Sequence, residues 1–136
     1  MRFEYAAPPQ GALFGKPLAT ITLSRNEREV TVSALVDSGA TISLLPYGIG
    51  CQLGLVWEEQ TIPIQLGGPL RGIPAKAVLL SGSITGLPET SFVMAWVAET
   101  EQPIPPILGQ VNFFQQFKVT FEGYANAFDI SSKNLL

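Results

Sequence analysis

The sequence predicts an all-β protein: a closed or partly open β-barrel of short strands and hairpins with one or two short helices. Eleven prolines and thirteen glycines divide the 136 residues into short pieces and leave little room for long helices. Between them lie runs in which apolar and polar residues alternate, which is typical of half-buried strands. Apolar residues make up 46% of the chain and charged residues 14%, so a real core is expected within a single domain over residues 1–136.

The first elements form a hairpin that ends at a charged residue. Residues 1–12, which contain Pro8, Pro9 and Gly11, are expected to be irregular. Residues 18–23 alternate as a strand does, residues 25–29 form a charged turn, and residues 30–36 provide the returning strand. We therefore predict a hairpin whose second strand leads directly into Asp37.

The middle of the chain predicts a helical turn and a second hairpin. Residues 47–55 can hold one or two helical turns that end near Gly54. Residues 57–66 are expected to be extended, and residues 60–80 to form a hairpin with a glycine-rich tip. An ordinary surface hairpin with a long loop explains this pattern equally well.

The last elements are short strands and one helix. Residues 100–106 contain three prolines and predict a stiff connector, and residues 111–117 predict a short helix with phenylalanines in the core. Further strands are expected at residues 83–87, 91–98, 118–122 and 127–130, the last two forming a third hairpin.

Composition excludes several classes of function. The chain has no histidine, which excludes Ser-His and Cys-His catalysis and most zinc sites, and no cofactor or metal is expected. The net charge is −3 without a basic patch, so no nucleic-acid partner is expected. Cys51 is expected to be a small buried hydrophobe. No signal peptide or membrane span is visible, so we expect a soluble, cytoplasmic protein without a membrane partner.

Asp37 ends an apolar strand and is followed by Ser38, Gly39 and Ala40. A charge at the end of a buried strand is costly unless something uses it. Gly39 permits a sharp turn, and the Ser38 hydroxyl can donate and accept hydrogen bonds beside the carboxylate. The simpler interpretation is an ordinary Asp-Ser-Gly turn after a strand.

A second distinctive stretch lies near the C-terminus. Ile107, Leu108 and Gly109 are followed by Gln110 and the predicted short helix. Together with the Asp37 loop, this stretch resembles the retropepsin-like aspartic proteases, the single-domain branch of retroviral type. The resemblance covers about residues 13–130, although only these two short motifs are distinctive. Retroviral members often carry arginine after that glycine, whereas Gln110 cannot form a charged contact.

The resemblance implies a site and an assembly. Asp37 would be catalytic, Ser38 would bond across a dimer axis, Gly39 and Ala40 would support the loop, and the glycine-rich tip would be a flap that closes over substrate. The residues of this expected flap are Leu66, Gly67, Gly68, Pro69, Leu70, Arg71 and Gly72. Those expected to pack behind the catalytic loop are Ile107, Leu108 and Gly109.

Peptide hydrolysis by carboxylates requires two of them sharing a proton, because two close carboxylates cannot both be charged cheaply. The only other aspartate, Asp129, has no following glycine and is expected to face solvent on an alternating strand. One chain thus carries half a site, which predicts a homodimer that acts on peptide or protein substrates as an aspartic endopeptidase. The alternative is a non-catalytic dimerisation or peptide-binding module of the same fold, in which the motif serves loop structure.

Overall fold

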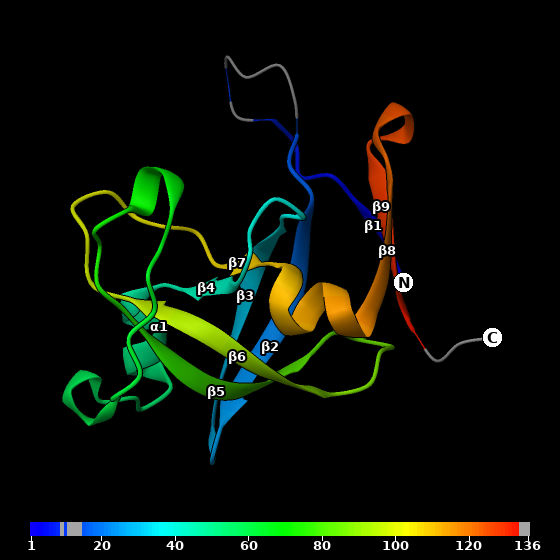
Figure 1. The fold of residues 1–136 in the computed structure, drawn as a ribbon. Helices are drawn as coiled ribbons and strands as arrows, with labels where there is room; N and C mark the ends of the chain where they lie inside the picture. Colours follow the sequence, from blue (N-terminus) through cyan, green and yellow to red (C-terminus); the bar gives the residue numbers. More distant parts are fainter. Residues whose placement is uncertain (9, 11–14, 134–136) are drawn as a thin grey trace.

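A computed structural model describes residues 1–8, 10 and 15–133. In this part of the chain, two groups of strands make up the fold, and Figure 1 shows them side by side. The closed barrel contains, in order, β2 (Leu18–Arg25), β3 (Arg28–Val36), β7 (Ile107–Leu108), β4 (Ser43–Leu45), β6 (Thr90–Val97) and β5 (Ala75–Ser83). The separate sheet contains β1 (Arg2–Glu4), β9 (Ala127–Ser132) and β8 (Phe117–Glu122). The predicted all-β class with a barrel is confirmed.

The first hairpin is formed as predicted. Strands β2 and β3 pair in antiparallel fashion from Leu18↔Leu35 to Arg25↔Arg28. Asn26 makes the turn with φ +55°, in the left-handed region that asparagine tolerates better than most residues. Alternation carries Ala19, Ile21 and Leu23 of β2 into the core, which explains the regular pattern in the sequence.

The predicted helical turn is α1 (Tyr47–Gln52), and Gly54 ends it with φ +80°. Gly50 faces the barrel so closely that a Cβ there would lie 2.2 Å from Nε1 of Trp96. Cys51 is exposed, so the expectation that it is buried was wrong. Successive residues of a helix point about 100° apart, so only one face of this short helix packs on the barrel.

The segment before the second hairpin corrects another prediction. Residues 57–66 are not extended throughout, because Trp57–Glu59 forms the helical turn η1. The predicted hairpin over residues 60–80 is confirmed only in part, because residues 75–80 belong to β5, which pairs with β6, and the arm over residues 60–66 forms no strand and reaches β5 through the single bridge Pro63↔Lys76. Pro63 fits this bridge although it lacks an N–H group, because the bonds come from its neighbours: Ile64 N–H donates to the Ala75 carbonyl at 2.9 Å, and Ala77 N–H donates to the Ile62 carbonyl at 2.8 Å. At the tip, Gly68–Leu70 forms the turn η2.

Residues 83–87 were expected to form a strand of their own, and this prediction was wrong. β5 continues to Ser83, and the chain then turns with Gly86 at φ +86° and a hydrogen bond from Leu87 N to Ile84 O of 2.9 Å. The apolar residues of the turn gave a misleading strand pattern. The strand expected at residues 91–98 is β6.

The C-terminal elements agree with the sequence. After β7 comes the short helical segment η3 (Gln110–Phe114), which is irregular because Asn112 has φ +69°. Strands β8 and β9 form the predicted third hairpin around η4 (Gly123–Ala125). Phe113 and Phe117 are buried and Phe114 is partly buried.

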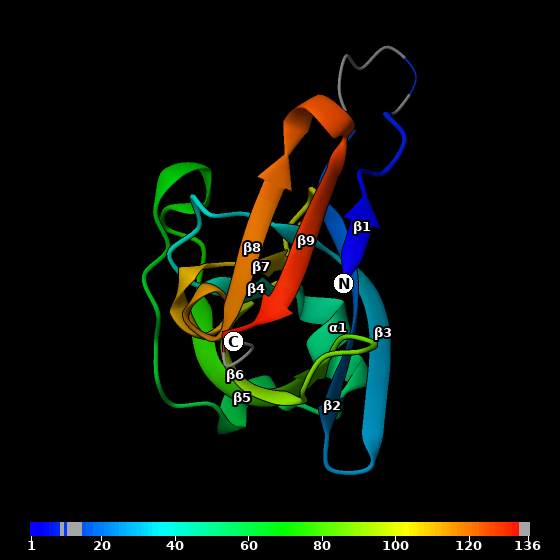
Figure 2. The same cartoon turned by 90° about the vertical axis from the view of Figure 1, so that its right-hand side faces the viewer.

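The N-terminal residues were expected to be irregular, and for Arg2–Glu4 this was wrong. β1 pairs with β9 through Arg2↔Asp129, Phe3↔Phe128 and Glu4↔Ala127. The Phe3 and Phe128 rings stack with centroids 5.1 Å apart. Figure 2 shows this three-stranded sheet in front of the barrel. Residues 9, 11 and 12 of the predicted irregular stretch lie outside the described residues.

The main core fills the barrel and extends beneath the three-stranded sheet. Trp96, Phe92 and Met94 of β6 are essentially inaccessible, as are Phe113 and Phe128. Among the described residues, none of the helices combines the length and the apolar character that crossing a membrane requires.

Candidate active site

Asp37 follows directly on β3 and is fixed by short-range hydrogen bonds. Its backbone N–H donates to the Leu108 carbonyl at 3.0 Å. Its side-chain Oδ1 accepts from the Gly39 N–H at 2.9 Å, and its carbonyl accepts from the Ala40 N–H at 3.2 Å. These bonds make a tight turn that leaves Oδ2 without a hydrogen-bond partner among the described residues. One carboxylate oxygen is thus held while the other stays available.

A second layer of hydrogen bonds comes from the segment after β7. Gln110 N–H donates to the Ala40 carbonyl at 2.8 Å, and Val111 N–H donates to the Thr41 carbonyl at 2.9 Å. The side-chain Nε2 of Gln110 donates to the Ser38 carbonyl at 2.6 Å. The loop over residues 37–41 is therefore attached along its length to residues 108–111.

Gly109 occupies a position that no other residue can fill without movement. A Cβ there would lie 2.7 Å from the Ala40 carbonyl oxygen and 2.8 Å from the backbone carbon of Ile42. The Gly109 N–H also donates to Oγ of Ser43 at 3.0 Å. Ser43 is completely buried, and its hydroxyl is a structural partner that sequence reasoning missed. The only signal was one polar residue within the apolar run of residues 42–45.

The Asp37 loop opens into a cleft of about 640 Å³. One wall is the loop itself, and the other is the tip of the second hairpin, which lies on the same side of the barrel in Figure 1. Among the described residues that line this cleft, Asp37 carries the only ionisable side chain. The lining residues are Asp37, Gly39, Ala40, Thr41, Ile42, Leu44, Ile64, Gln65, Leu66, Gly67, Gly68, Pro69, Leu70, Ile107 and Val111.

Not every residue of the expected flap faces this cleft. Leu66 to Leu70 line it, whereas Arg71 and Gly72 line a different hollow together with Trp57 and Lys76. Leu66 and Leu70 also pack with Ile107 in an apolar cluster on the outside of the barrel. The expected flap therefore rests on the barrel through leucines while its glycines are exposed.

The remaining predicted residues lie near the cleft or far from it. Ser38 is exposed at the edge of the loop, and Leu108 is fully buried behind it. Asp129 lies in the three-stranded sheet, where its Oδ2 is 3.0 Å from Nη1 of Arg2. Its side chain is 41% exposed, in line with the predicted solvent-facing position on a strand. The two aspartates of one chain thus do not meet in one site.

Comparisons with known proteins place the fold. The sequence matches no protein-family profile and no curated protein. The structure is similar to a retropepsin-like aspartic protease from Rickettsia conorii, with 15% identity and a TM-score of 0.61 over 94% of this chain and 88% of that chain. It is also similar to EIAV protease in complex with an inhibitor, with 17% identity and a TM-score of 0.52 over 71% of this chain and 84% of that one. At such identities the similarity shows the fold, which is that of the retropepsin-like aspartic proteases with one lobe per chain.

Proposed function

We propose that this chain of retropepsin fold is an aspartic endopeptidase that acts as a homodimer, with one Asp37 contributed by each subunit. One observation carries the proposal: of the described residues that line the cleft, Asp37 alone has an ionisable side chain, and the opposite wall is the glycine-rich tip over residues 66–70. A carboxylate facing a large and mostly apolar cleft is a usual setting for acid–base chemistry.

The second carboxylate must come from another copy of the chain. Within one subunit, Asp129 is held by Arg2 in the three-stranded sheet and lines no part of the cleft. A two-fold axis beside the Asp37 loop would bring two identical carboxylates together, and two-fold dimers are the commonest assemblies of soluble proteins. Ser38 and Gly39 are exposed on the loop and could meet their counterparts there.

The reaction follows from two carboxyl groups that share one proton. The ionised carboxylate takes a proton from water as the water oxygen attacks the peptide carbonyl carbon. The protonated carboxyl gives its proton to the carbonyl oxygen, so a neutral tetrahedral diol forms. The carboxyl that received the proton of the water then gives it to the amide nitrogen, while the other carboxylate takes a proton from a diol hydroxyl. The C–N bond breaks, and the products are a carboxylic acid and an amine. One peptide bond and one water molecule are consumed, and the carboxyl pair regains its starting state.

The substrate would be an extended peptide. Leu66 and Leu70 provide apolar contacts for its side chains, and the backbone groups of residues 66–70 could pair with it as a strand does. Gly68 has φ +58° and Gly72 has φ +88°, conformations that glycine adopts without strain and that suit a segment which moves.

The dimer interface would also use the three-stranded sheet. β1 pairs with β9 of its own chain, so its outer edge and that of β8 are the unpaired edges of this sheet within the described residues. Such edges can add a strand from a second subunit. The apolar tail over residues 134–136, expected to contribute to the interface, lies outside the described residues.

Digestion of a peptide library by wild type, Asp37→Asn and Asp129→Asn tests the proposal. Asp37→Asn keeps the shape of the side chain and should lose nearly all cleavage while keeping its dimer and its melting temperature. Asp129→Asn is the matched control and should cleave like wild type. Cleavage by Asp37→Asn at the wild-type rate would refute the assignment. A confirmed wild-type dimer that cleaves nothing from acidic to neutral pH would favour a non-catalytic dimerisation or peptide-binding module.

A further inference from the structure

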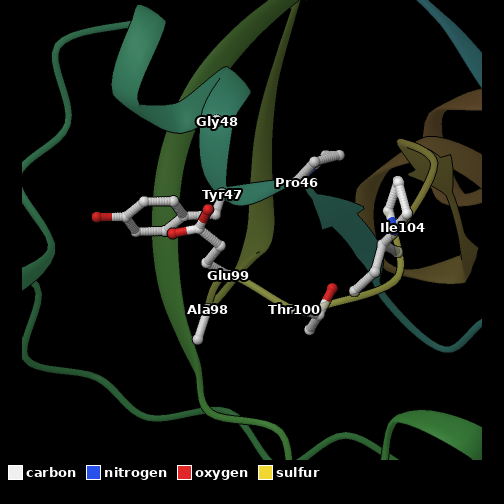
Figure 3. Close-up of a pocket in the computed structure, with 8 residues that line it drawn as sticks. Pro46, Tyr47, Gly48, Ala98, Glu99, Thr100 and Ile104 are labelled. Atoms are coloured by element: carbon white, nitrogen blue, oxygen red, sulfur yellow. The ribbon is translucent and has the colours of Figure 1, made fainter.

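A second hollow, of about 250 Å³, lies where β4 leads into α1 and where the chain leaves β6 (Figure 3). None of its residues lines the Asp37 cleft. Ile104 lines this hollow and also packs in the apolar cluster that contains Leu66, Leu70 and Ile107. The hollow is lined by Pro46, Tyr47, Gly48, Ala98, Glu99, Thr100, Pro103 and Ile104.

The aromatic wall of this hollow is held in place. The Tyr47 ring stacks on Trp96 with centroids 5.5 Å apart and an interplanar angle of 10°. The Trp96 Nε1–H donates to the Tyr47 carbonyl at 3.1 Å, and Trp96 is fully buried. Trp57 contacts the Tyr47 ring edge-on, with centroids 6.1 Å apart. A ligand would therefore meet a Tyr47 ring that is already ordered, which reduces the entropy lost on binding.

The polar groups of the hollow favour a cation. Glu99 is the only charged residue among the described lining residues, and it lines the hollow together with Tyr47, on which its charge acts (Figure 3). The Thr100 hydroxyl donates to the Gln102 carbonyl, so its oxygen can only accept from a ligand. A hydrogen bond with Cys51 and its charge raise the pKa of Tyr47 most, followed by desolvation and then by the charges of Glu58 and Glu99, so Glu99 acts on the Tyr47 side chain.

We propose that this hollow binds a guanidinium group, as carried by an arginine side chain of a peptide or protein. Its volume lies just below the roughly 300–1,000 Å³ of sites for drug-sized ligands, which suits one side chain. A carboxylate next to an aromatic ring provides the hydrogen-bond acceptors and the ring electrons that guanidinium prefers. The prolines and Ile104 would contact the methylene groups of the arginine stem. This proposal is independent of the proposed peptidase activity, and its test measures binding alone.

The two tryptophans make the test direct, since both contact Tyr47 and no other tryptophan is present. N-acetyl-arginine methylamide is titrated into the wild-type protein while the indole N–H signals are followed by NMR. We expect a saturable shift of the Trp96 signal, which weakens as salt is added because the pair is partly exposed. The neutral isostere N-acetyl-citrulline methylamide should cause no saturable shift.

Two matched variants then test whether the negative charge of Glu99 contributes to binding of the arginine probe. Glu99→Gln should weaken binding of the arginine probe about twofold to fivefold, within the range for an exposed ion pair. Glu101→Gln, an exposed carboxylate on the same connector outside the lining, should bind like wild type. Equal shifts with the citrulline probe, a shift that never saturates, or unchanged affinity in Glu99→Gln would each overturn the proposal. The wild-type arms keep the test valid even if a variant folds poorly.

Discussion

The side-chain amide of Gln110 donates to the backbone carbonyl of Ser38 across 2.6 Å. The backbone N–H of Gln110 reaches the Ala40 carbonyl at 2.8 Å, so one residue holds the loop on both sides of Gly39. Gln110 stands where retroviral members of the family often carry arginine. Its neutral side-chain amide nevertheless contacts the loop directly, through a hydrogen bond. Because the contact is to main chain, it positions Asp37 without touching its carboxylate.

Gln110→Glu should destabilise the loop and reduce turnover. The new carboxylate cannot donate to the Ser38 carbonyl and would repel its oxygen. We expect a loss of about 0.5–1.5 kcal/mol in the free energy of unfolding, the usual net effect of losing one hydrogen bond. In peptide assays kcat should fall more than KM rises, because the loop rather than the binding wall is displaced. Gln102→Glu, exposed on the connector, is the control and should leave the melting temperature and kcat unchanged.

Gly109→Ala should destabilise the protein, because its Cβ would meet backbone atoms of Ala40 and Ile42 that cannot rotate away. Overpacking of this kind costs about 1–3 kcal/mol. Gly48→Ala in α1 is the matched control, since nothing lies within 4 Å of a Cβ there, and it should stabilise by about 0.5–1 kcal/mol through helix propensity. Urea unfolding of both variants measures the difference. A Gly109→Ala variant as stable as wild type would contradict the close packing behind the loop.

Peptide cleavage should show a bell-shaped dependence on pH, with its maximum on the acid side. Two carboxylates that share a proton titrate as a pair, and activity requires the state with one proton between them. Values of kcat/KM measured across the pH range on one fluorogenic peptide provide the test. Asp129→Asn should give the same profile as wild type. A profile that stays flat from mildly acidic to alkaline pH would argue against a carboxylate pair.

The ion pair of the three-stranded sheet predicts a separate dependence on pH. Arg2 donates to Oε1 of Glu122 at 2.6 Å and Tyr124 to Oε2 at 2.8 Å, and these bonds, Arg2 first, lower the pKa of Glu122 from its ordinary 4.5. A lowered pKa in the folded state gives stability that is present above 4.5 and lost as the pH falls through the folded value.

Arg2→Gln should therefore move the carboxyl titration of Glu122 back up toward the ordinary pKa. Carbon NMR of the labelled carboxyl group measures this shift directly. Lys118→Gln, on the same sheet but without a bond to Glu122, should leave the titration where it is. An unchanged Glu122 titration in Arg2→Gln would show that the bond to Arg2 does not persist in solution.

Local sequence patterns were enough to predict the first and third hairpins, but not the pairing of β5 with β6. Alternation in residues 18–36 and the turn at Asn26 are local features, and the structure has them where they were expected. The motif residues could also be singled out, because a lone charge after an apolar strand is unusual whatever its partners are. Pattern reasoning therefore singled out the loop that carries Asp37, whereas the segment that lies behind it was expected only from the resemblance to the retropepsin-like proteases.

Other features depend on partners that are distant in the sequence. β1 has only three residues, too few to show a period, and it exists because Phe3 meets Phe128 across the sheet. The role of Ser43 depends on Gly109, which no local pattern connects with it. Cys51 was assigned from the average behaviour of cysteine, whereas its exposure depends on which face of α1 meets Trp96.

The hydrogen bonds between the Asp37 loop and residues 108–111 also limit when the loop can fold. Ser38 meets its partner Gln110 only 72 residues later in the chain, and Arg2 meets Asp129 after 127. During synthesis, the loop leaves the ribosome well before the segment that holds it exists. Contacts between residues that lie this far apart in the sequence slow folding, because the intervening chain must close into a long loop before the contact can contribute stability. The nascent chain would thus carry an unsupported Asp37 until residues 108–111 have been made, and any activity would be delayed until then.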